Sequence, residues 1–153
     1  MILEQQLLDV RGLLSFRGKV KQDGLPEIMK SMKEYVEAQG VRVTDGPISV
    51  TYAVEASPEG MVSDTEILLP ISGKVEANGT FAWKERLYIT NAVKLMYAGT
   101  PELFQAACEE MNAYVQEKQY VPITAGYVVT KGIDQLTGLI SMEVYMGISP
   151  NIL

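Results

Sequence analysis

The chain has 153 residues, of which 47% are apolar and 21% are charged, and its net charge is −6. This profile is typical of one or two small soluble domains and excludes extended disorder. The sequence contains no apolar run of about 18 residues and no basic segment followed by an apolar one at its start, so we expect neither a membrane span nor a signal peptide. The expected compartment is the cytoplasm.

Two residue types that carry much of enzyme chemistry are scarce. The chain has no histidine, and Cys108 is its only cysteine. This excludes an intrachain disulfide, a Cys/His zinc site, a Ser-His-Asp triad and a Cys-His dyad. The chain also lacks a run of lysines or arginines, which argues against nucleic acid as a partner. We expect no metal, no cofactor and no membrane partner.

The first half of the chain predicts a strand followed by a helix. Residues 11–20 are apolar and β-prone, and the stretch from Leu25 to Gln39 has helical periodicity. Pro26 stands where a first-turn residue has no N–H to lose, and Glu27 follows where the helix dipole favours negative charge. Apolar residues at three- and four-residue spacing predict an amphipathic helix that lies on a sheet.

Two further strands are predicted before the middle of the chain. Segments 48–54 and 64–72 are rich in β-branched residues, and a polar loop from Glu55 to Ser63 separates them. A turn at Asn78-Gly79-Thr80 then marks the junction between the two halves. Trp83 lies just beyond this turn, and the sequence leaves open whether it is exposed, packed across the halves, or part of a lid.

The second half repeats the same order of elements. A β-prone segment precedes a helix that starts at the natural N-cap Thr100 and is about one turn longer than the first helix. Cys108 lies on the apolar face of this helix and is predicted to be a small core side chain. The expected ranges are strand 86–98, helix 100–119, strand 125–130, loop 131–137 and strand 141–149. The unit β-α-β-β therefore occurs twice, at about 1–77 and 80–153, and we expect both copies to form one domain because about 70 residues bury little core alone.

Each repeat carries a glutamate in its last strand, Glu66 in the first and Glu143 in the second. Burying an unpaired carboxylate costs several kcal/mol, so such a group is paired, protonated or available to a cationic ligand. Strand alternation places Glu143 on the same face as Tyr145. The alternative is a carboxylate on a solvated sheet face or in an ordinary salt bridge.

Several tyrosines lie in the predicted strands and could form the aromatic walls of a pocket. An aromatic ring attracts a cation over its face by about 0.5–2 kcal/mol. The competing interpretation is that these tyrosines are half-buried core residues with a solvated hydroxyl. The candidates are Tyr52, Tyr97, Tyr127 and Tyr145.

The second half also resembles the GyrI-like effector-binding family, which includes the ligand-sensing domains of AraC-type and MerR-type multidrug regulators. The residues that carry this resemblance are Met96-Tyr97-Ala98-Gly99-Thr100-Pro101-Glu102-Leu103, Met111 to Val115, Gly126-Tyr127 and Glu143 to Ile148. The resemblance implies an α+β fold of two β-α-β-β units related by a pseudo-twofold axis. It further implies an antiparallel sheet with two helices on one face and an aromatic-lined cleft between the units.

The family resemblance also implies a role for a buried glutamate that holds the cation of a hydrophobic ligand. This role falls on Glu143, and the repeat offers Glu66 as its counterpart. The chain departs from the family pattern in two ways: Gly147 stands where a proline is usual, and no DNA-binding segment precedes the domain. The second departure leads us to expect a stand-alone module.

Three functions follow from these observations. The first is binding of a small hydrophobic or cationic molecule in a cleft lined by Glu143, Tyr145, Tyr127, Glu66, Tyr52 and Tyr97. The second is an accessory, adaptor or chaperone-like role with a protein partner, because the chain also resembles GyrI-like proteins of LXG toxin and type VII secretion clusters. The third is hydrolysis of small electrophiles, with a glutamate as general base and a tyrosine that polarises the substrate. We expect binding rather than catalysis, assign no catalytic residue, and leave a homodimer as one alternative.

Overall fold

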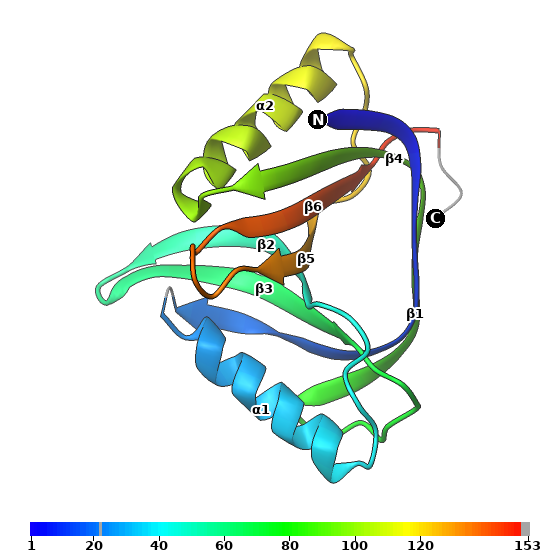
Figure 1. Ribbon diagram of the computed structural model, residues 1–153, viewed down its shortest axis with the longest axis vertical. Helices are drawn as coiled ribbons and strands as arrows, with labels where there is room; N and C mark the ends of the chain where they lie inside the picture. The colour runs from blue at the N-terminus through cyan, green and yellow to red at the C-terminus, as the bar shows by residue number, and fades with distance from the viewer. Residues whose placement is uncertain (22, 151–153) are drawn as a thin grey trace. The chain divides into compact units, whose positions relative to one another are not determined.

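The computed structural model describes residues 1–21 and 23–150 and has the predicted α+β class (Figure 1). The order strand, helix, strand, strand occurs twice, which confirms the predicted duplicated β-α-β-β architecture. The elements are β1 (Ile2–Lys21), α1 (Leu25–Ala38), β2 (Ile48–Ser57), β3 (Gly60–Pro70), β4 (Phe81–Gly99), the 3-10 turn η1 (Pro101–Leu103), α2 (Phe104–Glu117), β5 (Tyr127–Ile133) and β6 (Ile140–Gly147).

The strands are longer than the sequence pattern predicts. The two long strands begin at Ile2 and Phe81, well before the expected starts at residues 11 and 86. Most of the expected loop at 55–63 is a strand hairpin, because the ladder between β2 and β3 continues to the pair Ser57 and Gly60. Polar side chains on an exposed hairpin resemble a loop in sequence, which explains this error.

The two helices have equal α-helical length, 14 residues each. The extra turn expected in the second helix is the 3-10 turn η1, and the predicted proline lies at the start of both segments. Thr100 precedes η1 in an extended conformation, but its side chain makes no capping hydrogen bond. Its backbone carbonyl instead accepts a 3.3 Å hydrogen bond from the Leu103 N–H.

The residues gather into two compact units whose boundaries differ from those of the sequence repeats. The N-terminal unit comprises residues 10–87, and the C-terminal unit comprises residues 1–9 together with 88–153. Each long strand therefore contributes its first part to one unit and the remainder to the other. The expectation that the repeats form one domain stays a prediction.

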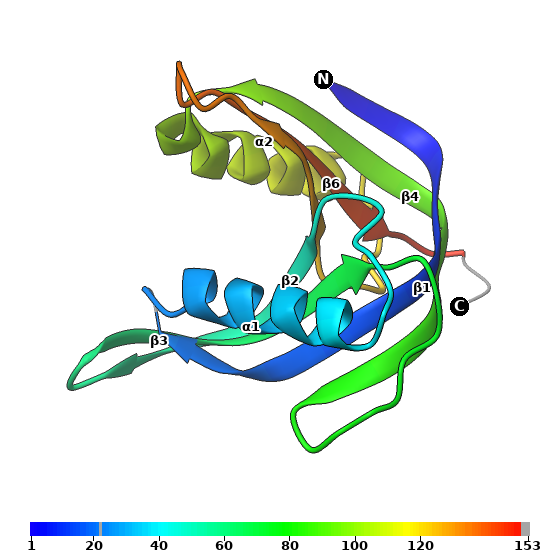
Figure 2. The same cartoon turned by 60° about the horizontal axis from the view of Figure 1, so that its bottom comes forward.

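The N-terminal unit contains a three-stranded antiparallel sheet with β3 in the centre. Glu66 of β3 lies opposite Arg17 of β1 and Val50 of β2. Helix α1 packs on one face of this sheet (Figure 2). The hydrophobic core of this unit consists of Leu14, Met32, Val36, Ile67, Leu69, Ile71, Val75 and Phe81. Trp83 packs against this core and is partly buried. Strand alternation places Glu66 on the face away from the helix.

The C-terminal unit repeats this arrangement with β6 in the centre. Glu143 of β6 lies opposite Met96 of β4 and Val129 of β5. Helix α2 covers one face, and Cys108 packs against the core there, as predicted. The core consists of Val93, Leu95, Met111, Val115, Val144 and Ile148. Glu143 therefore also lies on the helix-free face of its sheet.

Both long strands contain a residue with positive φ near the unit boundary. Gly12 of β1 has φ +80° and Asn91 of β4 has φ +46°. The Gly12 carbonyl accepts a 3.0 Å hydrogen bond from the Ile71 N–H, and the Asn91 carbonyl accepts a 3.3 Å bond from the Ile148 N–H. Glycine and asparagine are the residues that tolerate this conformation, and the two occupy equivalent positions of their strands.

Neither of the described helices is long and apolar enough to cross a membrane.

Candidate ligand-binding site

Glu66 lies on the helix-free face of β3 with its side chain only 11% exposed. Its Oε1 accepts a 2.9 Å hydrogen bond from the Tyr52 hydroxyl, and its Oε2 accepts a 2.8 Å bond from the Ser15 hydroxyl. The Lys84 ammonium lies 3.7 Å from Oε2. The carboxylate is therefore anchored by two neutral donors and faces one cation at the outer limit of an ion pair.

Tyr52 lies at an irregularity in β2, two residues after Val50, which pairs with Glu66. Thr51 and Ala53 pair with consecutive residues of β3, so Tyr52 is the extra residue of a β-bulge. The Arg17 guanidinium lies 4.1 Å from the centroid of the Tyr52 ring. Arg17 also pairs with Asp64 at 3.1 Å, and this pairing raises the pKa of Arg17 and lowers the pKa of Asp64. The hydroxyl of Tyr52 therefore contacts the Glu66 carboxylate, and the face of its ring contacts the Arg17 guanidinium.

Glu143 has a similar environment in the C-terminal unit. Its Oε1 accepts a 3.0 Å hydrogen bond from the Tyr145 hydroxyl, and the Lys94 ammonium lies 3.3 Å from its Oε2. The Lys94 and Glu143 side chains are 15% and 14% exposed. Lys94 also lies 5.2 Å from the centroid of the Tyr145 ring. Partial burial alone would lower the pKa of Lys94, but Tyr145 and Glu143 outweigh it and raise the pKa.

Each unit therefore contains a carboxylate–phenol pair with a cation over the phenol ring. We call these the Glu66 pair (Glu66 and Tyr52) and the Glu143 pair (Glu143 and Tyr145). The carboxylates are neither isolated nor simply solvated, because both accept hydrogen bonds and face a lysine. A bound cation would have to replace this lysine at the carboxylate, and in the Glu66 pair it would also have to replace Arg17 at the ring.

The other two candidate tyrosines are placed differently. The Tyr97 ring packs against Phe104 with centroids 5.4 Å apart, and its hydroxyl donates to the Thr100 carbonyl. Tyr97 also lines a surface hollow of about 270 Å³ that includes Glu143 and Lys131. Tyr127 lies opposite Tyr145 in the ladder between β5 and β6 and is half-buried. The structure thus brings Tyr97 near Glu143 but does not make it part of the Glu143 pair.

The sequence analysis named Tyr52 and Tyr145 but missed the other partners of the two glutamates. Ser15, Lys84 and Lys94 lie on other strands, and their positions depend on the strand register. Alternation within β4 shows only that Lys94 shares a face with Met96. The missing information was the pairing of Met96 with Glu143, which brings Lys94 opposite Tyr145.

A third carboxylate with two phenol partners lies in the C-terminal unit. Glu4 at the start of β1 accepts hydrogen bonds from the hydroxyls of Tyr114 and Tyr120. These bonds lower the pKa of Glu4 and raise the pKa of Tyr114 to about 12. This contact ties the first strand to the end of α2, and nothing in the sequence spacing indicates it.

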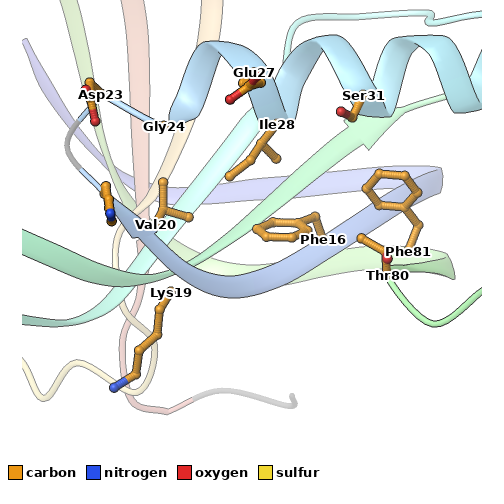
Figure 3. Close-up of a pocket in the computed structure, with 11 residues that line it drawn as sticks. Phe16, Lys19, Val20, Asp23, Gly24, Glu27, Ile28, Ser31, Thr80 and Phe81 are labelled. Carbon is orange, nitrogen blue, oxygen red and sulfur yellow. The ribbon is translucent and has the colours of Figure 1, made fainter.

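A larger cavity of about 450 Å³ lies in the N-terminal unit, beside the first turns of α1 (Figure 3). It contains none of the residues predicted for ligand binding. Phe16 and Val20 of β1 and Ile28 of α1 point into the gap between strand and helix, whereas Lys19 points away from it.

No cluster of acidic or sulfur ligands arranged for a metal ion occurs in residues 1–21 and 23–150.

Comparison with known proteins identifies the fold rather than a close relative. No family model and no curated protein sequence matches the chain. The structure is similar to EcmrR in its DNA complex, with TM-score 0.74 and 15% identity over 96% of this chain and 57% of that one. The C-terminal domain of EcmrR gives TM-score 0.72 and 14% identity over 96% and 98% of the two chains. The chain thus spans little more than half of EcmrR as it occurs in that complex.

A protein of Listeria innocua described as a hydrolase has the same fold, with TM-score 0.61 and 8% identity over 97% of this chain and 91% of that one. At these identities the likeness shows the fold alone. It confirms the fold expected from the GyrI-like resemblance.

Proposed function

We propose that the protein binds a small hydrophobic cation at one of its carboxylate–phenol pairs. The observation that carries the proposal is that both units already hold an internal cation over a tyrosine whose hydroxyl donates to a glutamate. A ligand cation would use the same carboxylate and the same aromatic face. The ligand's apolar body would then supply the burial that a lysine does not.

The Glu66 pair is the better candidate for exchange. Lys84 lies 3.7 Å from the Glu66 carboxylate and its side chain is 39% exposed, whereas Lys94 lies 3.3 Å from Glu143 and is 15% exposed. The longer and more exposed ion pair of Lys84 contributes less than the shorter and more buried pair of Lys94, so it costs less to break. Tyr52 is also 41% exposed, and a ligand that stacks on its ring would take the place of Arg17, which keeps its ion pair with Asp64.

The test compares three probes of similar shape and different charge: tetraphenylphosphonium, triphenylphosphine oxide and tetraphenylborate. We expect the cation alone to raise the unfolding midpoint in a saturable manner, because a ligand that binds only the folded state stabilises it by mass action. Glu66→Gln removes the charge and keeps an acceptor for Tyr52, and we expect it to weaken cation binding about tenfold or more. Cation binding that is unchanged in both Glu66→Gln and Glu143→Gln would overturn the proposal.

The matched control is Glu55→Gln in the same unit. Glu55 forms an exposed ion pair with Lys19, so this variant changes the net charge equally without touching either pair. We expect its cation affinity to equal that of the unmodified protein. An equal loss in Glu55→Gln and Glu66→Gln would show a general effect of net charge rather than a site.

A protein-binding role is the second candidate, and the hairpin between β5 and β6 favours it. Leu136 at its tip is 97% exposed, and the flanking Ile133 and Leu139 are 59% and 44% exposed. Exposed apolar clusters of this kind mark interaction surfaces. If a co-encoded partner binds here, Leu136→Asp should abolish co-purification while the unfolding midpoint stays unchanged. Co-purification that survives the substitution would contradict this role for the hairpin.

Catalysis is the third alternative, and we propose binding in preference to it. Hydrolysis of an activated ester or epoxide by the unmodified protein, lost in Glu143→Gln, would replace the binding proposal.

A further inference from the structure

The cavity beside α1 is within the size range of small-molecule sites and is separate from both carboxylate–phenol pairs. Its volume is about 450 Å³, against a usual range of roughly 300–1,000 Å³ for ligand pockets. Its apolar lining comes from the side chains of Phe16, Val20, Ile28 and Phe81. Phe16 and Phe81 meet edge to face with centroids 6.4 Å apart, so the cavity already has an aromatic wall.

The duplication shows what fills the equivalent place in the other unit. Arg17 pairs with Glu66 and Met96 pairs with Glu143, so β1 and β4 can be aligned with each other. In this alignment Gly18 corresponds to Tyr97. Where the C-terminal unit has an aromatic ring on the helix side of its strand, the N-terminal unit has no side chain.

The helices show the same difference. The buried residues Met32 and Val36 of α1 correspond to Met111 and Val115 of α2. Seven residues before the methionine, α1 has Leu25 and α2 has Phe104. Leu25 is 41% exposed, whereas Phe104 packs against the core of its unit.

Gly18 and Leu25 are the chain neighbours of the lining residues Lys19 and Gly24, and their counterparts in the C-terminal unit are the ring pair of Tyr97 and Phe104, whose centroids are 5.4 Å apart. The N-terminal unit lacks both rings. Phe16 leans over Gly18, where an added Cβ would lie 3.1 Å from the Phe16 Cζ, but the cavity remains beside it. The internal comparison indicates an aromatic ring as the group that fits.

The charges at the mouth of the cavity indicate the rest of the ligand. Lys19 and Lys21 line it, but each forms an ion pair with a glutamate outside it, Glu55 and Glu59. Asp23 and Glu27 also line it and form no ion pair with any residue that the structure describes. The mouth therefore carries two carboxylates without a cationic side-chain partner, of which Glu27 meets only the partial positive charge of the helix N-terminus, and these carboxylates favour a cation over an anion.

We propose that the cavity between α1 and β1 binds a compact aromatic compound with a cationic substituent, the ring against Phe16 and Phe81 and the cation at Asp23 and Glu27. This site goes beyond the proposed function, because it shares no residue with the Glu66 pair or the Glu143 pair. The ring occupies the place that Tyr97 and Phe104 fill in the sister unit.

The test uses phenethylammonium, 2-phenylethanol and phenylacetate as probes that share a ring and differ in charge. We expect phenethylammonium to bind about tenfold more tightly than phenylacetate, with 2-phenylethanol between them. Amide chemical shifts should change at Phe16, Ile28 and Phe81. The saturated analogue 2-cyclohexylethylammonium should bind more weakly, because it cannot form edge-to-face contacts with the two phenylalanines.

Two variants fill the cavity from different sides, so the test still works if one of them fails to fold. Ser31→Trp enters from α1 and Thr80→Trp enters from the loop before β4, and each should abolish phenethylammonium binding. Glu34→Trp adds the same ring to an exposed position of α1 that does not line the cavity and should leave binding unchanged.

Neutral substitutions at Asp23 and Glu27 test the cation contact separately from the ring contact. Asp23→Asn combined with Glu27→Gln should bring the affinities for the three probes to within about threefold of each other. Glu66→Gln should leave phenethylammonium binding unchanged, which separates this site from the proposed function. Absence of saturable binding by any of the aromatic probes, or binding that survives both Ser31→Trp and Thr80→Trp, would overturn the proposal.

Discussion

The hydroxyl of Tyr52 donates a 2.9 Å hydrogen bond to Oε1 of Glu66 from the extra residue of a β-bulge. Alternation from Val50, which pairs with Glu66, already directs Tyr52 to the Glu66 face, and the bulge leaves Tyr52 without a direct partner in β3. The equivalent bulge residue in β5 is Lys131, which lines the hollow at Glu143. The two units have thus kept the bulge and changed the residue on it.

Tyr52→Phe should destabilise the protein by about 1 kcal/mol, because one hydrogen bond to a largely buried carboxylate is lost while the ring under Arg17 remains. Tyr52→Leu should cost about 0.5–1 kcal/mol more, since it also removes the cation–π contact. Urea denaturation of the three proteins measures both differences. Equal stability of the Phe and Leu variants would show that Arg17 gains nothing from the ring.

Lys94→Met should destabilise the protein by about 1–3 kcal/mol, because it leaves the Glu143 carboxylate without its ammonium partner at 14% exposure. Adding Glu143→Gln to this variant should restore part of the loss, since an amide needs no counter-charge. A double-mutant cycle of unfolding free energies measures this coupling. Strictly additive effects would mean that the 3.3 Å pair makes no net contribution.

Gly12→Ala should destabilise the protein by roughly 1–3 kcal/mol, because φ is +80° and a Cβ would lie 3.1 Å from the Trp83 ring and 3.2 Å from the Ile71 carbonyl oxygen. Asn91→Gly is the matched variant at the equivalent position of β4. We expect it to be nearly neutral, with loss of the 2.9 Å bond from the Asn91 side chain to the Pro150 carbonyl as its main effect. Thermal unfolding of both variants measures the asymmetry.

Glu4 should give the protein an acid-sensitive contribution to stability. The hydrogen bonds from Tyr114 and Tyr120 lower the pKa of Glu4 below its usual 4.5. The contribution is therefore complete above about pH 4.5 and is lost as the pH falls through the lower pKa of the folded state. Glu4→Gln should flatten this part of the stability profile, measured as the urea midpoint between pH 3 and 7, roughly the range in which carboxylates titrate.

The pKa of Tyr114 tests the same contact with Glu4 at alkaline pH. Its pKa is raised from 10.0 to about 12 by the bond to Glu4, so its contribution is present below pH 10 and is lost as the pH rises through 12. Spectrophotometric titration should show that the raised pKa values of Tyr114 and Tyr120 both return toward 10.0 in Glu4→Gln. An unchanged titration would contradict the assignment of Glu4 as their acceptor.

The sequence predicted the elements well because their signals are local. Pro26 and Pro101 mark the two helix starts, and the periodic apolar residues mark the faces that pack on the sheets. The candidate glutamates were also visible, because a charge in an apolar strand is conspicuous. These signals need no knowledge of which strand lies beside which.

What the sequence could not show depends on contacts between distant segments. Lys84 and Ser15 reach Glu66 only through the register of three strands, and Glu4 meets Tyr114 over a separation of 110 residues. No residue type near Tyr52 indicates a β-bulge in the sequence. The long strands were underestimated because their first residues, which include Glu4 and Lys84, alternate less clearly than the residues that follow.

The partition of β1 and β4 between the units means that neither sequence repeat contains all the residues of one compact unit. The turn at 78–80 separates the two sequence repeats. Phe81 and Trp83 follow this turn, yet they pack with Leu14 and Met32 of the first repeat. A nick at this turn should therefore leave two fragments that stay associated, since each carries part of the same hydrophobic cluster. Residues 1–77 expressed alone would lack Phe81 and Trp83, which pack in the core of the N-terminal unit. We therefore expect the two fragments to fold when they are mixed and residues 1–77 not to fold alone.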